Sequence, residues 1–278
     1  MLHRDVGLCG GRLMDFNSFV NDVNRVVNFV WTAVACRLPA GKSPETSAHV
    51  MATRPSAGRS AARKADAGVI RAQILAAASE EFAARGLNGA RLDMIAKSAR
   101  TTRAMIYYYF GGREALYLAA LEEAYRNIRA AERELDITHM PPVPAMRRLI
   151  EFVFDYYQAH PAFVALVVTE NQNGGRYIRK SRQLRRINVS IIDTLRAVLD
   201  HGAQEGVFRP GIDAIDVHLA ISALGFFQVA NRWTFSYLFR RDLRSPAEVA
   251  KNRAMVVEIV LRYLAAAAAR TEGSASGG

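Results

Sequence analysis

The sequence predicts an all-α protein with a helix-turn-helix arrangement in its first half. Apolar residues recur at helical spacing from Val69 almost to the C-terminus, and no alternating strand pattern exceeds a few residues. Glycine and proline residues divide this pattern into segments of ordinary helix length. The positive charge is concentrated, because residues 51–113 hold 11 cations and 4 anions while the chain as a whole carries a net charge of +11. Such a basic segment attracts polyanions, for example nucleic acid.

The first 66 residues form a region of their own. Apolar residues recur at helical spacing between Phe16 and Val34, but polar and charged residues interrupt them, which excludes a membrane span and a typical signal peptide. A new composition, rich in Ala, Ser, Gly and Arg, begins at Met51. We expect translation to begin near Met51; the alternative is a genuine additional helix. Residues 1–66 are therefore predicted to be an N-terminal extension and basic arm, disordered or in part not native.

Three helices are predicted next. The first begins near Val69 and ends at Arg85 and Gly86. Two short helices follow over residues 92–99 and 102–110, which makes a helix-turn-helix arrangement. On the second short helix, Ile106 and Phe110 share the core face, and Thr102, Arg103, Ala104, Tyr107 and Tyr108 lie toward the outside.

The rest of the chain reads as further helices, with about nine in all. A long helix is predicted over residues 113–135, and another runs up to His160 and Pro161. The remaining helices are expected over residues 161–170, 179–205, 213–239 and 246–269, the last opened by a capping box at Ser245. Residues 271–278 are expected to be a disordered tail.

The sequence contains no recognisable pattern of catalytic or metal-binding residues. The six histidines are scattered, and the two cysteines, Cys9 and Cys36, are too few for a Cys-rich metal site. No Gly-rich phosphate loop and no nucleophile turn of the G-x-S-x-G type occurs. We therefore expect no metal, no cofactor and no enzymatic activity.

The helix-turn-helix segment carries a family resemblance. Its residues are Gly86, Ala90, Leu92, Ile95, Ala96, Ala99, Thr102, Ile106, Tyr107, Tyr108, Tyr109, Phe110, Gly112, Arg113, Glu114 and Leu116. At this fixed spacing the segment resembles the DNA-binding domain of TetR-family (tetracycline-repressor-like) transcriptional regulators. The resemblance implies a helix-turn-helix DNA-binding domain over residues 67–116 and a larger helical ligand-binding and dimerisation domain over residues 117–270.

The resemblance also implies roles for single residues. Thr102 matches the residue that starts the recognition helix and bonds phosphate, and Arg113 matches a cation that reaches phosphate from the next helix. The predicted DNA-binding residues are Arg91, Thr102, Arg103, Ala104, Met105, Tyr107, Tyr108, Tyr109 and Arg113. Two positions depart from the family pattern. Arg91 replaces the usual helix cap, and Arg100 replaces a glycine of the turn, which predicts backbone strain there.

The predicted function is that of a cytoplasmic, homodimeric regulator, most simply a repressor released from a palindromic DNA operator by a small-molecule effector. The last two helices resemble those that form the dimer interface in this family, and no membrane partner is expected. A sequence-independent architectural DNA-binding protein, a helical small-molecule-binding protein or enzyme with an incidental basic segment, and an activator remain alternatives. Candidate residues of the effector pocket are the aromatic and polar residues expected on inward faces: Phe154, Tyr157, Phe163, Glu170, Tyr177, Phe226, Phe227, Asn231 and Trp233.

Overall fold

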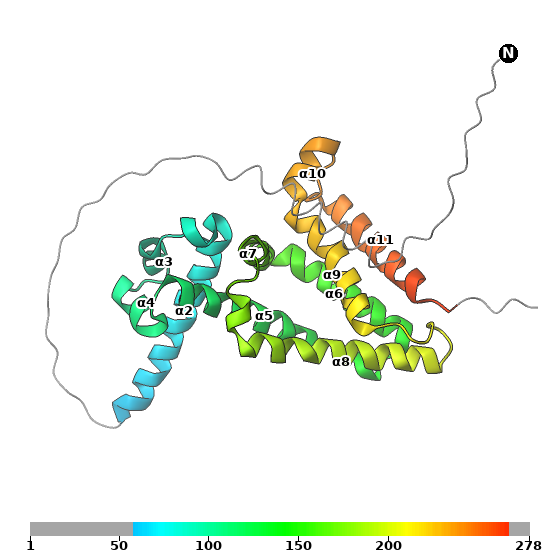
Figure 1. Ribbon diagram of the computed structural model, residues 1–278, viewed down its shortest axis with the longest axis horizontal. Helices are drawn as coiled ribbons and strands as arrows, with labels where there is room; N and C mark the ends of the chain where they lie inside the picture. The colour runs from blue at the N-terminus through cyan, green and yellow to red at the C-terminus, as the bar shows by residue number, and fades with distance from the viewer. Residues whose placement is uncertain (1–57, 267–278) are drawn as a thin grey trace, which may run out of the picture. The chain divides into compact units, whose positions relative to one another are not determined.

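The computed structural model describes residues 58–266, with side chains from residue 67 onward, and the predictions for residues 1–57 and 267–278 lie outside these residues (Figure 1). The described part is helical, and its β-structure is a single bridge between Phe208 and Ala265. The α-helices are α2 (Gly58–Gly89), α3 (Leu92–Ser98), α4 (Arg103–Phe110), α5 (Arg113–Arg133), α6 (Pro142–Ala159), α7 (Pro161–Gln172), α8 (Arg182–Gln204), α9 (Ala214–Ala230), α10 (Arg232–Phe239) and α11 (Pro246–Leu264). Two 3-10 turns, η1 (Ile137–His139) and η2 (Ile178–Lys180), lie between them. The predicted all-α fold class is confirmed.

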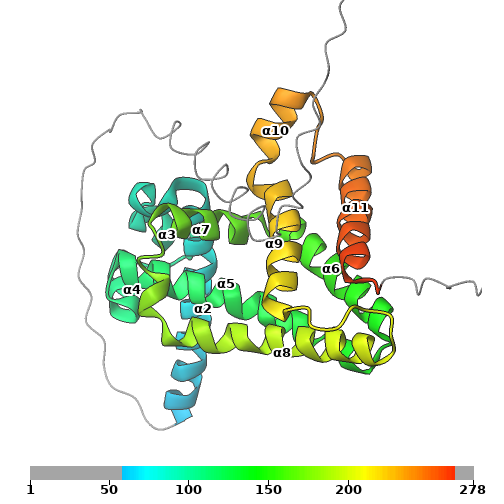
Figure 2. The ribbon, with the colours of Figure 1, turned by 45° about the vertical axis from the view of Figure 1, so that its right-hand side comes forward.

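Helices α2, α3 and α4 form the head of the protein, at the end away from α10 and α11 (Figure 2). Their shared core contains Ile74, Phe82, Ile95 and Ile106, all fully buried. Tyr117 of α5 completes it, with its ring 5.2 Å from the ring of Phe82 in an edge-to-face contact. The predicted core face of the second short helix, with Ile106 and Phe110, is therefore correct.

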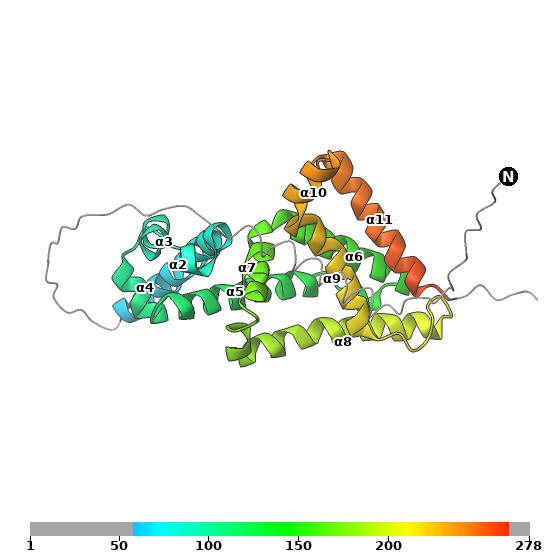
Figure 3. The same cartoon turned by 45° about the horizontal axis from the view of Figure 1, so that its top comes forward.

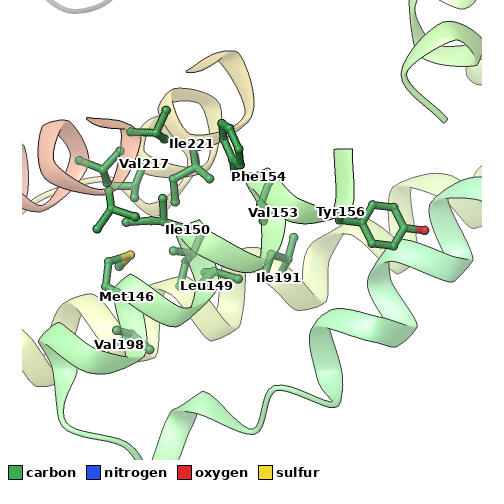
Figure 4. Packing of buried hydrophobic residues seen from close by; sticks show 14 of the residues in the cluster. Met146, Leu149, Ile150, Val153, Phe154, Tyr156, Ile191, Val198, Val217 and Ile221 are labelled. Carbon is green, nitrogen blue, oxygen red and sulfur yellow. The ribbon is translucent and has the colours of Figure 1, made fainter. Parts of the chain in front are cut away.

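Helices α5 to α11 form the body of the protein. Helix α6 lies among α8, α9 and α11, and its apolar face supplies Met146, Leu149, Ile150 and Val153 to the main core cluster (Figure 4). Leu195 of α8 and Val217 of α9 pack into the same cluster and are fully buried. This packing gives the body a continuous core of its own.

Helix α5 belongs to both parts. Leu116, Tyr117 and Leu121 in its first half lie in the core of the head, whereas Ile128 in its second half lies in the core of the body. Because one continuous helix carries both sets of contacts, a movement of α5 in the body is transmitted to the head without an intervening flexible linker.

The structure corrects two predicted boundaries. Helix α2 begins at Gly58, inside the segment expected to be a flexible arm, although Gly86 has the predicted helix-ending geometry with φ 65° and ψ 179°. The predicted single helix over residues 213–239 is wrong, because the chain bends by 69° between α9 and α10 (Figure 3). Asn231, at the bend, has φ −109° and ψ 9° and ends one helix while it precedes the next.

Within the described residues, no single helix has the length and apolar composition needed to cross a membrane, and the bent pair α9–α10 meets those two criteria only when its helices are taken together.

Candidate nucleic-acid interface and effector region

The N-terminal end of α4 is a short, well-capped helix start on the surface of the head. Thr102 is the N-cap residue, and its Oγ1 accepts a hydrogen bond from the backbone N–H of Met105 at 3.4 Å. This cap fixes the direction of α4, and the free N–H groups of a helix N-terminus favour a bound anion such as phosphate. The predicted start of the recognition helix is therefore present.

The outer face of α4 presents polar and aromatic side chains to solvent. Arg103, Ala104 and Tyr107 are exposed, and Tyr108 is 78% exposed, while Ile106 on the opposite face is completely buried. This division matches the prediction from helical spacing. An exposed helix face that carries arginine and tyrosine can contact both base edges and phosphates.

Arg103 is held in place by two neighbours. Its Nη2 donates to the hydroxyl of Tyr107 at 3.4 Å, and its guanidinium lies 5.7 Å from the centre of that ring. Its Nη1 is 3.6 Å from a carboxylate oxygen of Asp93 on α3. The hydrogen bond to Tyr107 and the nearby Asp93 raise the pKa of Arg103. Sequence reasoning missed Asp93, an acidic residue of α3 whose carboxylate faces Arg103 of α4.

Two other predicted residues of α4 are less accessible. Met105 and Tyr109 are half-buried, and the ring of Tyr109 packs against Tyr108 at 5.1 Å and against Phe110 at 6.4 Å. Their side chains therefore help to position α4 as well as bordering its outer face.

The two flanking arginines differ from the simple prediction. Arg91 has no side-chain cap for α3, as expected, but its backbone N–H donates to Glu81 Oε1 at 3.0 Å. Arg113 is exposed, and its Nη1 donates to the carbonyl oxygen of Asn88 at 3.3 Å. Arg113 thus ties the start of α5 to the end of α2.

The turn between α3 and α4 carries the predicted strain. Arg100 has a φ of 51°, a left-handed conformation that an L-residue adopts at a cost of about 1 kcal/mol. The backbone N–H of Thr101 donates to the carbonyl of Ala96 at 2.9 Å and closes the end of α3. The structure therefore keeps the turn that a glycine would make more easily.

Part of the predicted effector pocket is brought together in the body. Tyr157 of α6 lies 5.9 Å from Phe163 of α7 and 5.9 Å from Phe226 of α9, measured between ring centres. Phe154 lies one helical turn before Tyr157 on α6 and is buried. It lies beside α9, because a Cβ atom added to Gly225 of α9 would be 3.7 Å from the Cα of Phe154. These aromatic residues come from three helices and share one interior.

Other predicted pocket residues have different surroundings. Glu170 is buried, and its Oε1 accepts hydrogen bonds from the backbone N–H groups of Tyr177 at 2.7 Å and Ile178 at 2.8 Å, so it holds the loop after α7. The hydroxyl of Tyr177 donates to Glu114 Oε1 at 3.3 Å. Trp233 is exposed, and Arg244 lies 4.4 Å from the centre of its ring, so the structure does not place Trp233 in an interior pocket.

The last two predicted pocket residues lie at the bend between α9 and α10. Asn231 is buried, and Phe227 contacts Phe235 of α10 with ring centres 6.1 Å apart. Asn231 therefore occupies the bend itself, and Phe227 packs across it.

Comparison with known proteins matches both parts of the chain to one family. The description "Bacterial regulatory proteins, tetR family" fits residues 74–120, and "Tetracyclin repressor-like, C-terminal domain" fits residues 142–260. The HTH-type transcriptional repressor NicS of Pseudomonas putida is 35% identical over 194 residues, which are 70% of this chain and 92% of that protein.

The chain belongs to the TetR family. This TetR-family protein is a DNA-binding transcriptional regulator with a helix-turn-helix head. The HTH-type transcriptional repressor SCO4008 of Streptomyces coelicolor is also similar, at 30% identity over 57% of this chain and 78% of that protein. Two solved structures show the fold: a tetR-family regulatory protein from Rhodococcus (22% identity, TM-score 0.56, 72% of this chain and 98% of that one) and FadR of Bacillus subtilis in complex with stearoyl-CoA (20%, 0.54, 69% and 98%).

Sequence reasoning missed a polar group in the interior of this TetR-family regulator. Arg129 and Glu132 of α5 are buried as an ion pair, with Arg129 Nη1 2.8 Å from Glu132 Oε2. A signal was available, because Arg129 and Glu132 follow the buried-face residue Tyr125 by four and seven positions, which places all three on one face of a helix.

Proposed function

We propose that this TetR-family protein is a homodimeric repressor that leaves a palindromic operator when a small-molecule effector binds in the body. Helix α4 enters the major groove in this proposal, with Arg103 and Ala104 toward the base edges and Tyr107 and Tyr108 toward the backbone. The observation that carries the proposal is the exposed face of α4 opposite the fully buried Ile106. The operator lies in the cytoplasm, and the protein acts there.

Coupling between body and head follows from contacts of α5. The hydroxyl of Tyr117 donates to the carbonyl of Leu166 on α7 at 3.3 Å, and Tyr177 packs on Tyr117 with ring centres 5.3 Å apart. Tyr177 also bonds Glu114, next to Arg113 at the start of α5. An effector that shifts α6 or α7 therefore changes the position of α5 and, with it, the spacing of two heads in a dimer.

The surface of α9, α10 and α11 supports the dimer. Ile215 on α9 and Met255 and Ile259 on α11 are apolar and exposed. Helix α10 adds further exposed apolar residues, namely Trp233, Tyr237, Leu238 and Phe239. Several exposed apolar residues on neighbouring helices are typical of an interaction site, and a second copy of the chain covers them in this proposal.

Two relatives named as repressors, NicS and SCO4008, support repression over activation. A more distant relative, FasR of Mycolicibacterium smegmatis, is named an activator and is 27% identical over 53% of this chain. A reporter gene placed behind the selected operator separates the two modes, because deletion of a repressor raises expression and deletion of an activator lowers it.

The decisive experiment selects binding sites for the full-length protein from random duplex DNA. We expect a palindrome with half-sites about one helical turn apart, and two chains per duplex by sedimentation. Recovery of unrelated sequences with equal affinity would instead support the architectural protein, and no binding at low salt would support the incidental basic segment.

A further inference from the structure

The buried pair Arg129–Glu132 has hydrogen-bonding capacity that the protein itself does not use. The two residues are 3% and 7% exposed. Arg129 Nη1 and Glu132 Oε2 face each other at 2.8 Å, but among the described residues no hydrogen-bond partner reaches Nε of Arg129 or Oε1 of Glu132. Buried polar atoms are nearly always hydrogen-bonded, so two unsatisfied atoms beside a buried ion pair indicate a binding site for another polar group.

The side chains around this pair are largely aromatic, and besides the pair itself the carboxylate of Glu170 acts on Tyr125 and the guanidinium of Arg133 acts on Glu132. Burial raises the pKa of Tyr125 to about 12, and burial followed by the charge of Arg129 lowers the pKa of His218 on α9 to about 4. Tyr125 packs edge-to-face on Phe163 with ring centres 5.3 Å apart. Tyr157, from α6, donates to Ser222 Oγ at 3.4 Å. The cluster thus combines one guanidinium with flat apolar walls and phenol hydroxyls.

A groove leads from the surface to the same corner of the body. Its volume is about 1250 Å³, and residues of α2, α5 and the corner between α6 and α7 line it. Tyr156 and Phe163 lie in its wall, and His160 stacks on Tyr156 with ring centres 3.9 Å apart. Figure 4 shows the ring of Tyr156, at one edge of the apolar cluster, directed away from Leu149 and Ile150. Burial and then the nearby charge of Glu132 raise the pKa of Tyr156. Tyr156 therefore adjoins both the groove and the buried pair.

We propose that the effector is a small monocarboxylic acid with an apolar body, and that Arg129 binds its carboxylate. This inference rests on the proposed function, since it names the chemical class of the effector. A planar guanidinium binds a carboxylate through two parallel hydrogen bonds, and a single buried arginine matches a single negative charge better than the double charge of a phosphate. The aromatic walls accept the apolar body.

The same geometry explains how binding reaches the DNA-binding head. The carboxylate of the effector takes the place of Glu132 beside Arg129, and Glu132 takes up a proton as it loses this partner. The apolar body extends past Tyr156 toward the groove. The opposite wall of that groove is α2, where Leu75 and Ser79 line it. Occupation of the groove presses on the first helix of the head.

The test titrates full-length protein with benzoate and hexanoate, their uncharged amides benzamide and hexanamide, and phenyl phosphate, and measures binding by calorimetry. We expect at least one carboxylate to bind, with its amide weaker by about tenfold or more, because a charge-assisted hydrogen bond is lost. The double variant Arg129→Met, Glu132→Gln keeps the volume of the pair without its charges and should lose at least about tenfold in carboxylate affinity. The matched control is Asp193→Asn, Arg196→Met, which removes an exposed pair of the same spacing on α8 and should bind as the wild type does.

Operator binding without ligand is measured on the same samples, so that the two proposals fail separately. If the wild type binds no operator sequence, the proposed function is contradicted. A wild type that binds its operator but none of the carboxylates overturns this inference, as do amides that bind equally, phenyl phosphate that binds tighter than benzoate, or a double variant that keeps its carboxylate affinity. If the double variant does not fold, Arg129→Lys provides a second variant. It keeps the positive charge but cannot make the two parallel hydrogen bonds of a guanidinium, so we expect it to bind the carboxylate more weakly.

Discussion

Arg103, which we propose contacts DNA from the exposed face of α4, is held by two neighbours in the protein without DNA. Tyr107 holds the guanidinium from the same helix, and Asp93 holds it from the helix before. When Arg103 leaves Asp93 to contact a base edge or a phosphate, an exposed ion pair is lost. Such pairs contribute little to stability. The arrangement therefore limits the freedom of Arg103 without blocking its contact with DNA.

A pair of variants separates these two contacts. Arg103→Ala should lower the preference for operator over scrambled duplex by about 10- to 100-fold, because a bidentate contact to a base edge is lost. Asp93→Asn should raise the affinity for both duplexes a few-fold, since it removes an acid beside the phosphates and frees Arg103. Fluorescence anisotropy with both duplexes measures the two effects. An unchanged operator-to-scrambled ratio in Arg103→Ala would exclude a base-reading role for this residue.

The strained turn gives a prediction about stability at the same scale. Arg100→Gly should raise the free energy of unfolding by up to about 1 kcal/mol, because glycine adopts a φ of 51° without strain. Arg100→Ala is the matched control, since it removes the same side chain and keeps the strain. Urea unfolding measures both variants, and equal stability of the two would show that the backbone of this turn is not strained.

Single residues also show what the sequence could predict. The outward face of α4 and the strain at Arg100 were predictable, because helical spacing and a family glycine position determine them locally. The contact of Asp93 with Arg103 and the unpaired Nε of Arg129 were not, because they depend on how two helices meet or on which buried atoms find no partner in the folded interior. The effector prediction that placed Trp233 inside was misled by the continuous apolar pattern around it.

At the scale of elements, the bend between α9 and α10 marks the clearest limit of sequence reasoning. No proline interrupts residues 213–239, and the one glycine, Gly225, lies inside α9, so the pattern reads as one helix. Asn231 is a weak helix former, and tertiary packing decides the bend there, with Phe227 and Phe235 in contact across it. The other helices were predicted because capping residues, glycine or proline mark where they begin or end, as Ser245 and Pro246 mark the start of α11.

The end of α8 provides a test of packing between elements. Gly202 is buried on α8, and a Cβ added there would lie 2.0 Å from Cδ2 of Phe208, whose ring is itself buried. Gly202→Ala should therefore lower the free energy of unfolding by about 1–3 kcal/mol, because the ring must move within a packed core. Gly68→Ala on α2 meets nothing within 4 Å and should be neutral or slightly stabilising. Thermal unfolding compares the two, and a fully stable Gly202→Ala would contradict the packing of Phe208.

The whole molecule joins two cores through one helix. The interior of the body also contains titratable groups, and their effects on stability have opposite signs. Burial raises the pKa of Glu132 to about 7 against the opposing effect of Arg129, so this group favours the folded state as the pH falls from about 7. His218, with its pKa lowered to about 4, does the reverse.

The contribution of His218 can be measured by its pH dependence. Between its unfolded pKa of about 6.5 and its folded pKa of about 4, the unfolded chain binds a proton that the folded chain does not, so stability falls as the pH falls. From pH 7.5 to about pH 5, His218→Gln should lose about 2 kcal/mol less than the wild type, because Glu132 and Arg129 are present in both proteins. Urea unfolding at the two pH values measures this difference. Equal losses would mean that His218 is protonated alike in both states.

The most direct test of DNA recognition by α4 is the operator affinity of Ala104→Asp. Ala104 is exposed in the first turn of α4, where an acid is favourable to the helix, so the variant should fold at least as well as the wild type. An acid at the reading face should nevertheless lower operator affinity by about 100-fold or more, because it opposes the charge of the DNA at close range. The same change at exposed Ala197 of α8 is the control and should leave the affinity unchanged. Wild-type operator affinity in a folded Ala104→Asp variant would contradict the assignment of α4 as the helix that enters the groove.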